Sequence, residues 1–298
     1  MNASFGIDHP LIAVNDIELL RDRMISLGFN MTAIGRHPWG TSTSLAMFEG
    51  CLIEIMGIHD ESLLDEFPAG DFRFGRHVHT FLQEREGIAL TALHSTDVMA
   101  DAEHAEAAGF TVSGHLEFGR DVALPEGRAG RTRTTLALMP DARWPRLSFF
   151  LCQQHRPELI YVPEWLDHPN TVCGICGVTV LADNEDQKAL MRKLEGLYGS
   201  AEEIAGGFSV GTANGPIRIR SKQAIENDFG TLQSVVTASN EPCIVAMDLR
   251  YNNEEELCRW IANSGLDHRT VGDMLTLVGS ADTGNTFLRF RKSLRSEF

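Results

Sequence analysis

The stretch that decides the fold is GIDHPLIAVNDIELLRDRMISLGFNMTAIGRHPWGTSTSLAMFEGCLIEIMGI, residues 6–58. Its apolar, β-branched beginning predicts a strand over residues 7–14. Asp16 is a good N-cap for a following helix, whose apolar residues recur at helical spacing and which ends at Gly28. Three short β-prone pieces come next, at 30–34, 42–48 and 51–58. The stretch therefore predicts one βαβββ unit.

The same order of elements recurs three more times along the chain. The first strands of these further units are expected at 88–93, 175–181 and 244–249. A single unit leaves one sheet face uncovered, so the units must pair. We predict an α+β fold of four βαβββ units in two pairs. A proline-containing linker at 155–170 would separate an N-terminal pair (1–158) from a C-terminal pair (168–298).

Composition excludes several classes of partner. The 298 residues carry 26 basic and 41 acidic side chains, a net charge of −15. This charge argues against nucleic acid or an anionic membrane surface as the main partner, since both are polyanions. No apolar run approaches the ~20 residues needed to cross a bilayer, and the N-terminus lacks a secretory pattern. The six cysteines are scattered, which favours a cytoplasmic protein with reduced thiols. We also expect the partner to be a small molecule, with a homodimer as the candidate assembly.

Three strings carry a resemblance to a known superfamily. IDHPLIAVND resembles the first strand of the vicinal oxygen chelate superfamily, which includes glyoxalase I and the extradiol dioxygenases. GRHPWGTSTSLAMFEGCLIEIMGI resembles a section of glyoxalase-like domain proteins, and FFLCQQHRPELIYVPEWLDHPNTVCGICGVTVLAD resembles the junction between their halves. The resemblance implies that each pair of units forms an incomplete barrel of curved sheet, with a divalent metal (Zn, Mn, Fe, Ni or Mg) in its cup.

The metal ligands implied by the resemblance are a first-strand His and a last-strand Glu. His9 and Glu54 match these positions in the first unit. The second unit has no such match, whereas a catalytic metal usually has about three protein ligands. Either Gln153, His155 or another His completes the site, or the site has lost its metal. The third and fourth units also lack the His, so we expect the C-terminal pair to be structural.

His9 and Glu54 also have a case that is independent of the resemblance, because both stand within apolar strands. Glu54 stands between two isoleucines in an apolar strand, where a carboxylate is costly to bury unless it is paired or metal-bound. The alternative is a Glu on the solvent side of an edge strand. We assign Glu54 and His37 to catalysis. The expected walls of a small-molecule pocket are Trp39, Phe48, Phe149 and Phe150. Rim packing is the alternative for the loop that carries His37 and Trp39.

Two further clusters have less demanding interpretations. His77 and His79 alternate as on one face of a strand, and we expect them to be exposed or packed rather than metal-bound. Arg128, Arg131 and Arg133 form a basic patch, for which a solvated loop is the default and recognition of a substrate anion the alternative.

Two functional hypotheses follow. The first is a metal-dependent enzyme that binds a small molecule through two neighbouring oxygens and acts as a lyase, isomerase or dioxygenase. The second is a protein that sequesters a small molecule in the same cup without chemistry.

Overall fold

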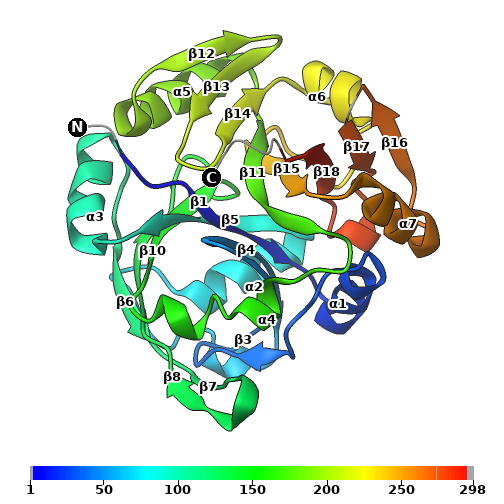
Figure 1. Cartoon of the computed structure of the whole chain (residues 1–298). Coiled ribbons are helices and arrows are strands. Elements are labelled where there is room, and N and C mark those ends of the chain that lie inside the picture. The colour runs from blue at the N-terminus through cyan, green and yellow to red at the C-terminus, as the bar shows by residue number, and fades with distance from the viewer. Residues whose placement is uncertain (1–2, 273, 294–298) are drawn as a thin grey trace.

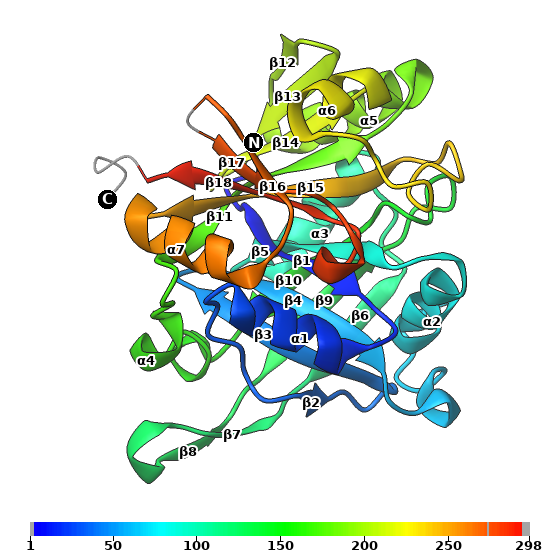
Figure 2. The same ribbon diagram turned by 90° about the vertical axis from the view of Figure 1, so that its right-hand side faces the viewer.

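Two curved eight-stranded sheets form the framework of the computed structural model, which describes residues 3–272 and 274–293. Figures 1 and 2 show the N-terminal sheet in blue to green and the C-terminal sheet, which begins with the green strand β11, in green to red above it. Each sheet contains two βαβββ units joined through their first strands, so the predicted fold of four paired units is confirmed. None of the described helices combines the length and hydropathy needed to span a bilayer.

The N-terminal sheet has the strand order β2-β3-β4-β1-β5-β10-β9-β6. The first strands of its two units, β1 and β5, run antiparallel at the centre, and each pairs in parallel with the last strand of its own unit. The elements of this half of the chain are β1 (Ile7–Ala13), α1 (Ile17–Ser26), β2 (Gly35–Arg36), β3 (Thr41–Phe48), β4 (Cys51–Ile58), α2 (Phe74–Glu84), β5 (Gly87–Ser95), α3 (Val98–Ala107), β6 (Gly114–Phe118), β7 (Asp121–Ala123), β8 (Ala129–Arg131), β9 (Thr134–Met139) and β10 (Ser148–Gln154). Of these, β7 and β8 pair with each other in a separate two-stranded sheet.

The C-terminal sheet repeats this arrangement in the order β12-β13-β14-β11-β15-β18-β17-β16. A short helix, α4 (Pro163–Leu166), lies in the connection between the two sheets. The elements that follow are β11 (Val172–Leu181), α5 (Asn184–Tyr198), β12 (Ala201–Ile204), β13 (Gly207–Gly211), β14 (Pro216–Arg220), α6 (Lys222–Phe229), β15 (Cys243–Tyr251), α7 (Glu254–Ser264), β16 (His268–Val271), β17 (Met274–Leu277) and β18 (Phe287–Lys292).

One apolar core joins the outer faces of the two sheets. It contains Ile53 and Leu151 from the first sheet and Val178 and Leu249 from the second, together with buried residues of α1, α3, α5 and α7. The concave face of the N-terminal sheet belongs to a separate cluster, which α2 completes. Because the shared core occupies the outer faces, the concave face is left to form a cavity.

Two local expectations were wrong. His77 and His79 lie on the helix α2, whose buried residues Phe74, Val78 and Phe81 recur at helical rather than strand spacing. The strand expected over 30–34 is reduced to a single bridge at Met31, and pairing resumes only at β2.

Candidate functional site

A cavity opens on the concave face of the N-terminal sheet. Including its open mouth it has a volume of about 750 Å³. Strands of both units line it, and the connection between the sheets closes one side with Leu159, Ile160 and Trp165. The wall is largely apolar and aromatic, and includes Trp39, Phe74, Phe118 and Phe150. Its polar members are therefore few and stand out.

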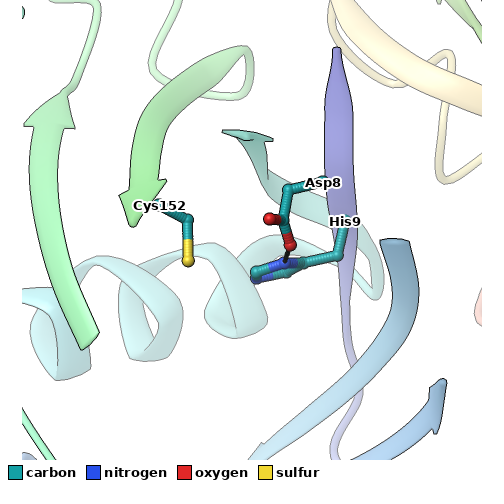
Figure 3. A group of neighbouring side chains, drawn as sticks. All are labelled: Asp8, His9 and Cys152. Carbon is teal, nitrogen blue, oxygen red and sulfur yellow. Dashed lines mark hydrogen bonds and ion pairs between the residues drawn. The ribbon is translucent and has the colours of Figure 1, made fainter. Parts of the chain in front are cut away.

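His9 reaches the cavity from β1, and a bulge places Asp8 beside it. Successive residues of a regular strand point to opposite faces, but the pairing of β1 with β5 shifts register between Ile7 and His9. Asp8 is completely buried, and its Oδ1 lies 2.6 Å from Nδ1 of His9. Figure 3 shows these two side chains together on β1, with Cys152 of β10 facing them. The bulge thus brings two polar residues to one point.

Glu54 of β4 meets the other nitrogen of the same ring. Its Oε2 lies 3.2 Å from His9 Nε2, and its Oε1 accepts a hydrogen bond of 2.5 Å from the Thr43 hydroxyl. The order Asp8–His9–Glu54 is therefore a line of carboxylate, imidazole and carboxylate. All three residues are buried or nearly so, with Glu54 7% exposed. The buried Glu54 is paired, as its apolar flanks require.

The ionisation of these groups follows from their contacts. Burial acts to lower the pKa of His9, but the hydrogen bonds that its ring donates to Asp8 and Glu54 outweigh burial and raise that pKa above its ordinary value. Burial acts to raise the pKa of Glu54, yet the bond and charge of His9 hold it below its usual range. The pKa of Asp8 is lowered in the same way, because the contacts with His9 and His94 outweigh burial; His94 Nδ1 lies 3.2 Å from Asp8 Oδ2. The cluster therefore keeps two carboxylates ionised inside an apolar wall.

His37 and Trp39 also line the cavity, from the loop GRHPWG. Their rings are stacked, with centroids 4.7 Å apart, and His37 Nδ1 lies 2.9 Å from the Thr41 hydroxyl. Burial lowers the pKa of His37 to about 3, so its imidazole is neutral. A neutral ring held this way can exchange hydrogen bonds with a ligand. The structure thus brings together His9, His37, Trp39 and Glu54.

The other predicted site residues lie elsewhere. Gln153 points to the start of α3, where its side chain binds the backbone of Thr96 and Val98. His155 lies 2.8 Å from the Thr135 hydroxyl through its Nε2. Neither lines the cavity. Phe48 and Phe149 are buried in the shared core on the opposite face of the sheet, and Phe150 forms the wall instead.

Sequence reasoning missed several members of the site. Asp8 was overlooked because regular alternation puts it on the other face of β1, and only the bulge reverses this. Arg120 and the residues of the inter-sheet connection come from loops, whose positions no periodicity fixes. Phe150, by contrast, was among the walls expected from the sequence, and it shares a face of β10 with Cys152.

The superfamily implies a divalent metal, and the donor atoms fit two of its ligand positions. Ligands at bond lengths of about 2.1 Å lie roughly 3 Å apart on one ion, which matches the 3.2 Å between His9 Nε2 and Glu54 Oε2. Asp8 at Nδ1 is the outer carboxylate that ligating histidines commonly have. In the second unit, Leu90 and Phe150 occupy the positions equivalent to His9 and Glu54. Glu54 pairs with Leu11, two residues after His9, and Phe150 likewise pairs with Ala92, two residues after Leu90. The second unit thus offers neither a His nor a Glu at these two positions.

Cys152 is the third residue of a compact cluster. Ligand atoms of Asp8, His9 and Cys152 all lie within 4.8 Å of one another. Burial raises the pKa of the Cys152 thiol well above its ordinary value, and Asp8 and Glu54 add to the effect. The sulfur is therefore held as a thiol.

Comparison with known proteins agrees with this architecture. The model of a family described as glyoxalase-like domain matches residues 7–195. No curated protein matches the chain. Among solved structures, a hypothetical protein from Staphylococcus aureus is 12% identical with a TM-score of 0.65, and the alignment covers 97% of this chain and 100% of that one.

Two further structures are similar. A mutant of 4-hydroxymandelate synthase from Streptomyces coelicolor is 14% identical with a TM-score of 0.61, over 98% of this chain and 93% of that one. A xylose isomerase-like TIM barrel/4-hydroxyphenylpyruvate dioxygenase fusion protein is 11% identical with a TM-score of 0.59, over all of this chain and 50% of that one. At these identities the likeness shows the fold, and it confirms the vicinal oxygen chelate architecture expected from the sequence.

Proposed function

The chain belongs to the glyoxalase-like domain family, and from that premise we propose that its N-terminal cup is the active site of a metal-dependent enzyme acting on a small molecule. The observation that carries the proposal is the line Asp8–His9–Glu54 at the base of an aromatic cavity. His9 Nε2 and Glu54 Oε2 would hold a divalent cation, and two neighbouring substrate oxygens would complete its coordination.

The chain's own residues have distinct tasks in this proposal. Asp8 fixes the orientation of the His9 ring, and Thr43 fixes Glu54. His37 offers a neutral imidazole to a substrate oxygen, and its stack on Trp39 keeps the ring in place. The aromatic wall and the inter-sheet connection exclude water. A bound cation supplies Lewis acidity toward the substrate oxygens, which suits lyase, isomerase or dioxygenase chemistry.

Metal content tests the proposal directly. We expect protein purified without added metal, then loaded with Mn²⁺, Zn²⁺ or Fe²⁺ and desalted, to retain about one ion per chain. His9→Ala and Glu54→Gln should each abolish retention, because one ligand remains. His155→Ala serves as the matched control, since His155 does not line the cavity. A wild-type protein that retains none of these ions would contradict the proposal.

One observation favours a second candidate function, a metal-free binding protein. Leu90 and Phe150 put apolar side chains where the second unit would provide ligands, and Phe150 packs against His9 with ring centroids 5.5 Å apart. Thermal stabilisation by small aromatic compounds that is equal in chelator-treated and metal-loaded protein, without turnover, would support this candidate.

A further inference from the structure

Arg120 is the one arginine or lysine among the residues that line the cavity. It follows β6 and precedes β7, and its backbone is fixed to Thr132 of the neighbouring chain segment. The Arg120 N–H donates to the Thr132 hydroxyl at 2.9 Å, and the Thr132 N–H donates to the Arg120 carbonyl at 2.8 Å. The position of the residue is thus set by the sheet, although its side chain comes from a loop.

The guanidinium of Arg120 has no ion pair or side-chain hydrogen bond with any described residue. Two arginines of the facing segment, Arg131 and Arg133, do have anionic partners. Arg131 pairs with Asp121 at 2.9 Å, and Arg133 pairs with Glu117 at 2.8 Å. Burial lowers the pKa of Arg120, and the negative charge of Glu54 offsets this in part. Arg120 is half-buried, and its guanidinium lines the cavity without an anion from the described residues, so it is available to pair with an anionic ligand.

Arg120 lines the same cavity as His9 and Glu54, from the segment between β6 and β7. Glu54 influences Arg120 electrostatically, but the two form no ion pair within 4.0 Å. Gly35 makes space for the guanidinium, since a Cβ at Gly35 would lie 2.8 Å from Arg120 Nη1. A ligand between them would meet Arg120 on one side and His9 and Glu54 on the other.

We propose that the cavity binds a small aromatic carboxylate, with the carboxylate paired to Arg120 and the ring against Trp39, Phe74 and Phe118. This inference rests on the proposed function, because it takes the N-terminal cup as the substrate site. A single arginine compensates one negative charge, which favours a carboxylate over a phosphate dianion. The aromatic walls favour a ring over a flexible aliphatic chain.

Matched ligands test the charge requirement. Isothermal titration calorimetry is carried out with 3-phenylpropanoate and 3-phenylpropanamide, which share shape but differ in charge. We expect the acid to bind wild-type protein at least about tenfold more tightly than the amide. Arg120→Gln should remove this preference and leave the amide affinity unchanged. Arg131→Gln, which removes the same charge from the exposed end of the segment, should keep the preference.

A second variant covers the case in which Arg120→Gln does not fold. The added methyl of Gly35→Ala comes closest to the far end of the flexible Arg120 side chain and meets Thr43 only at ordinary van der Waals distance, so the fold is retained and the guanidinium is displaced. We expect a reduced acid preference with an unchanged circular dichroism spectrum. Equal binding of acid and amide by wild-type protein, binding of neither compound, or a preference that survives both variants would overturn the inference.

The two proposals fail in different ways. If metal retention is lost in His9→Ala but wild-type protein shows no preference for the acid, the carboxylate proposal is contradicted and the metal-site proposal is supported. An acid preference that depends on Arg120 in a protein that retains no metal would do the reverse.

Discussion

The two cups of this molecule are built on one scaffold and contain opposite chemistry. Both first strands have a bulge at the same place, at Asp8 in β1 and at Cys176 in β11. When the two sheets are aligned on these bulges, the pair His9–Ala92 corresponds to Gly177–Asp248. By the same alignment, Arg218 occupies the position equivalent to Glu54, and Arg289 the position equivalent to Phe150. The C-terminal cup therefore lacks the His and has an arginine where the Glu would be.

The C-terminal cluster satisfies itself. Asp248 is completely buried, and its Oδ1 accepts from Arg289 Nε at 2.7 Å. Its Oδ2 accepts from Arg289 Nη2 at 2.8 Å and from Arg218 Nη1 at 2.6 Å. The Arg289 guanidinium also lies over the ring of Phe229 from α6, 4.2 Å from its centroid. In the N-terminal cup, by contrast, Arg120 is left without an anion beside an open cavity. A self-compensated cluster supports a structural role, and an uncompensated one supports a binding role.

The largest effect that would break this comparison is expected from Asp248→Ala. It leaves the buried Arg289 and the half-buried Arg218 without their anion, so we expect the free energy of unfolding to fall by about 3–5 kcal/mol in urea denaturation. Asp121→Ala is the control, because Asp121 pairs with Arg131 at the surface and exposed ion pairs contribute little. A small loss from Asp248→Ala would contradict a structural role for the C-terminal cluster.

A smaller effect is expected from Asn214→Ala, which tests how the C-terminal half supports the site. Asn214, between β13 and β14, accepts from the Ile7 N–H and donates to the Ile7 carbonyl, both at 2.8 Å. These bonds hold β1 next to its bulge at Asp8. Their loss leaves two backbone groups unpaired, and we expect a cost of about 1–3 kcal/mol in unfolding free energy.

The same variant should weaken metal retention in the N-terminal cup, because the position of Asp8 depends on the held backbone. The exposed Asn240→Ala is the matched control for stability and metal content. If Asn214→Ala lowers stability but leaves metal retention intact, the two halves are coupled in folding and independent at the site.

The repeat was predictable because its signals are local. Asp16 caps the first helix as expected, and Asp97, Asp183 and Asn253 cap the corresponding helices of the other units. The alternation of β4 places Glu54 on the concave face. Those caps and periods fixed the four units from residue types alone. His9 and Glu54 followed from their places on first and last strands.

The rest of the site depends on features that one sequence does not encode locally. A bulge of one residue turns Asp8 toward His9, and strand parity decides between Phe149 and Phe150. The connection around Ile160 and Trp165 looked like a linker because of its prolines, but it packs on Leu45, Met47 and Leu52 and closes the cavity. Long-range packing of this kind becomes visible only with the sheets in place.

The pH dependence of folding provides the finest distinction within the N-terminal cup. The pKa of His37 falls from 6.5 to about 3 on burial, so between these values the unfolded chain binds a proton at His37 that the native protein does not. Stability from this residue is thus fully present above about pH 6.5 and is lost as the pH falls toward 3, by at most about 1.4 kcal/mol per pH unit.

His37→Gln, which retains a polar side chain beside Thr41, should flatten the decline between pH 6.5 and 5 in urea denaturation of chelator-treated protein. The exposed His115→Gln should leave the slope unchanged. Equal slopes for wild type and His37→Gln would mean that His37 is accessible to protons, and that the loop GRHPWG opens rather than forming a fixed wall.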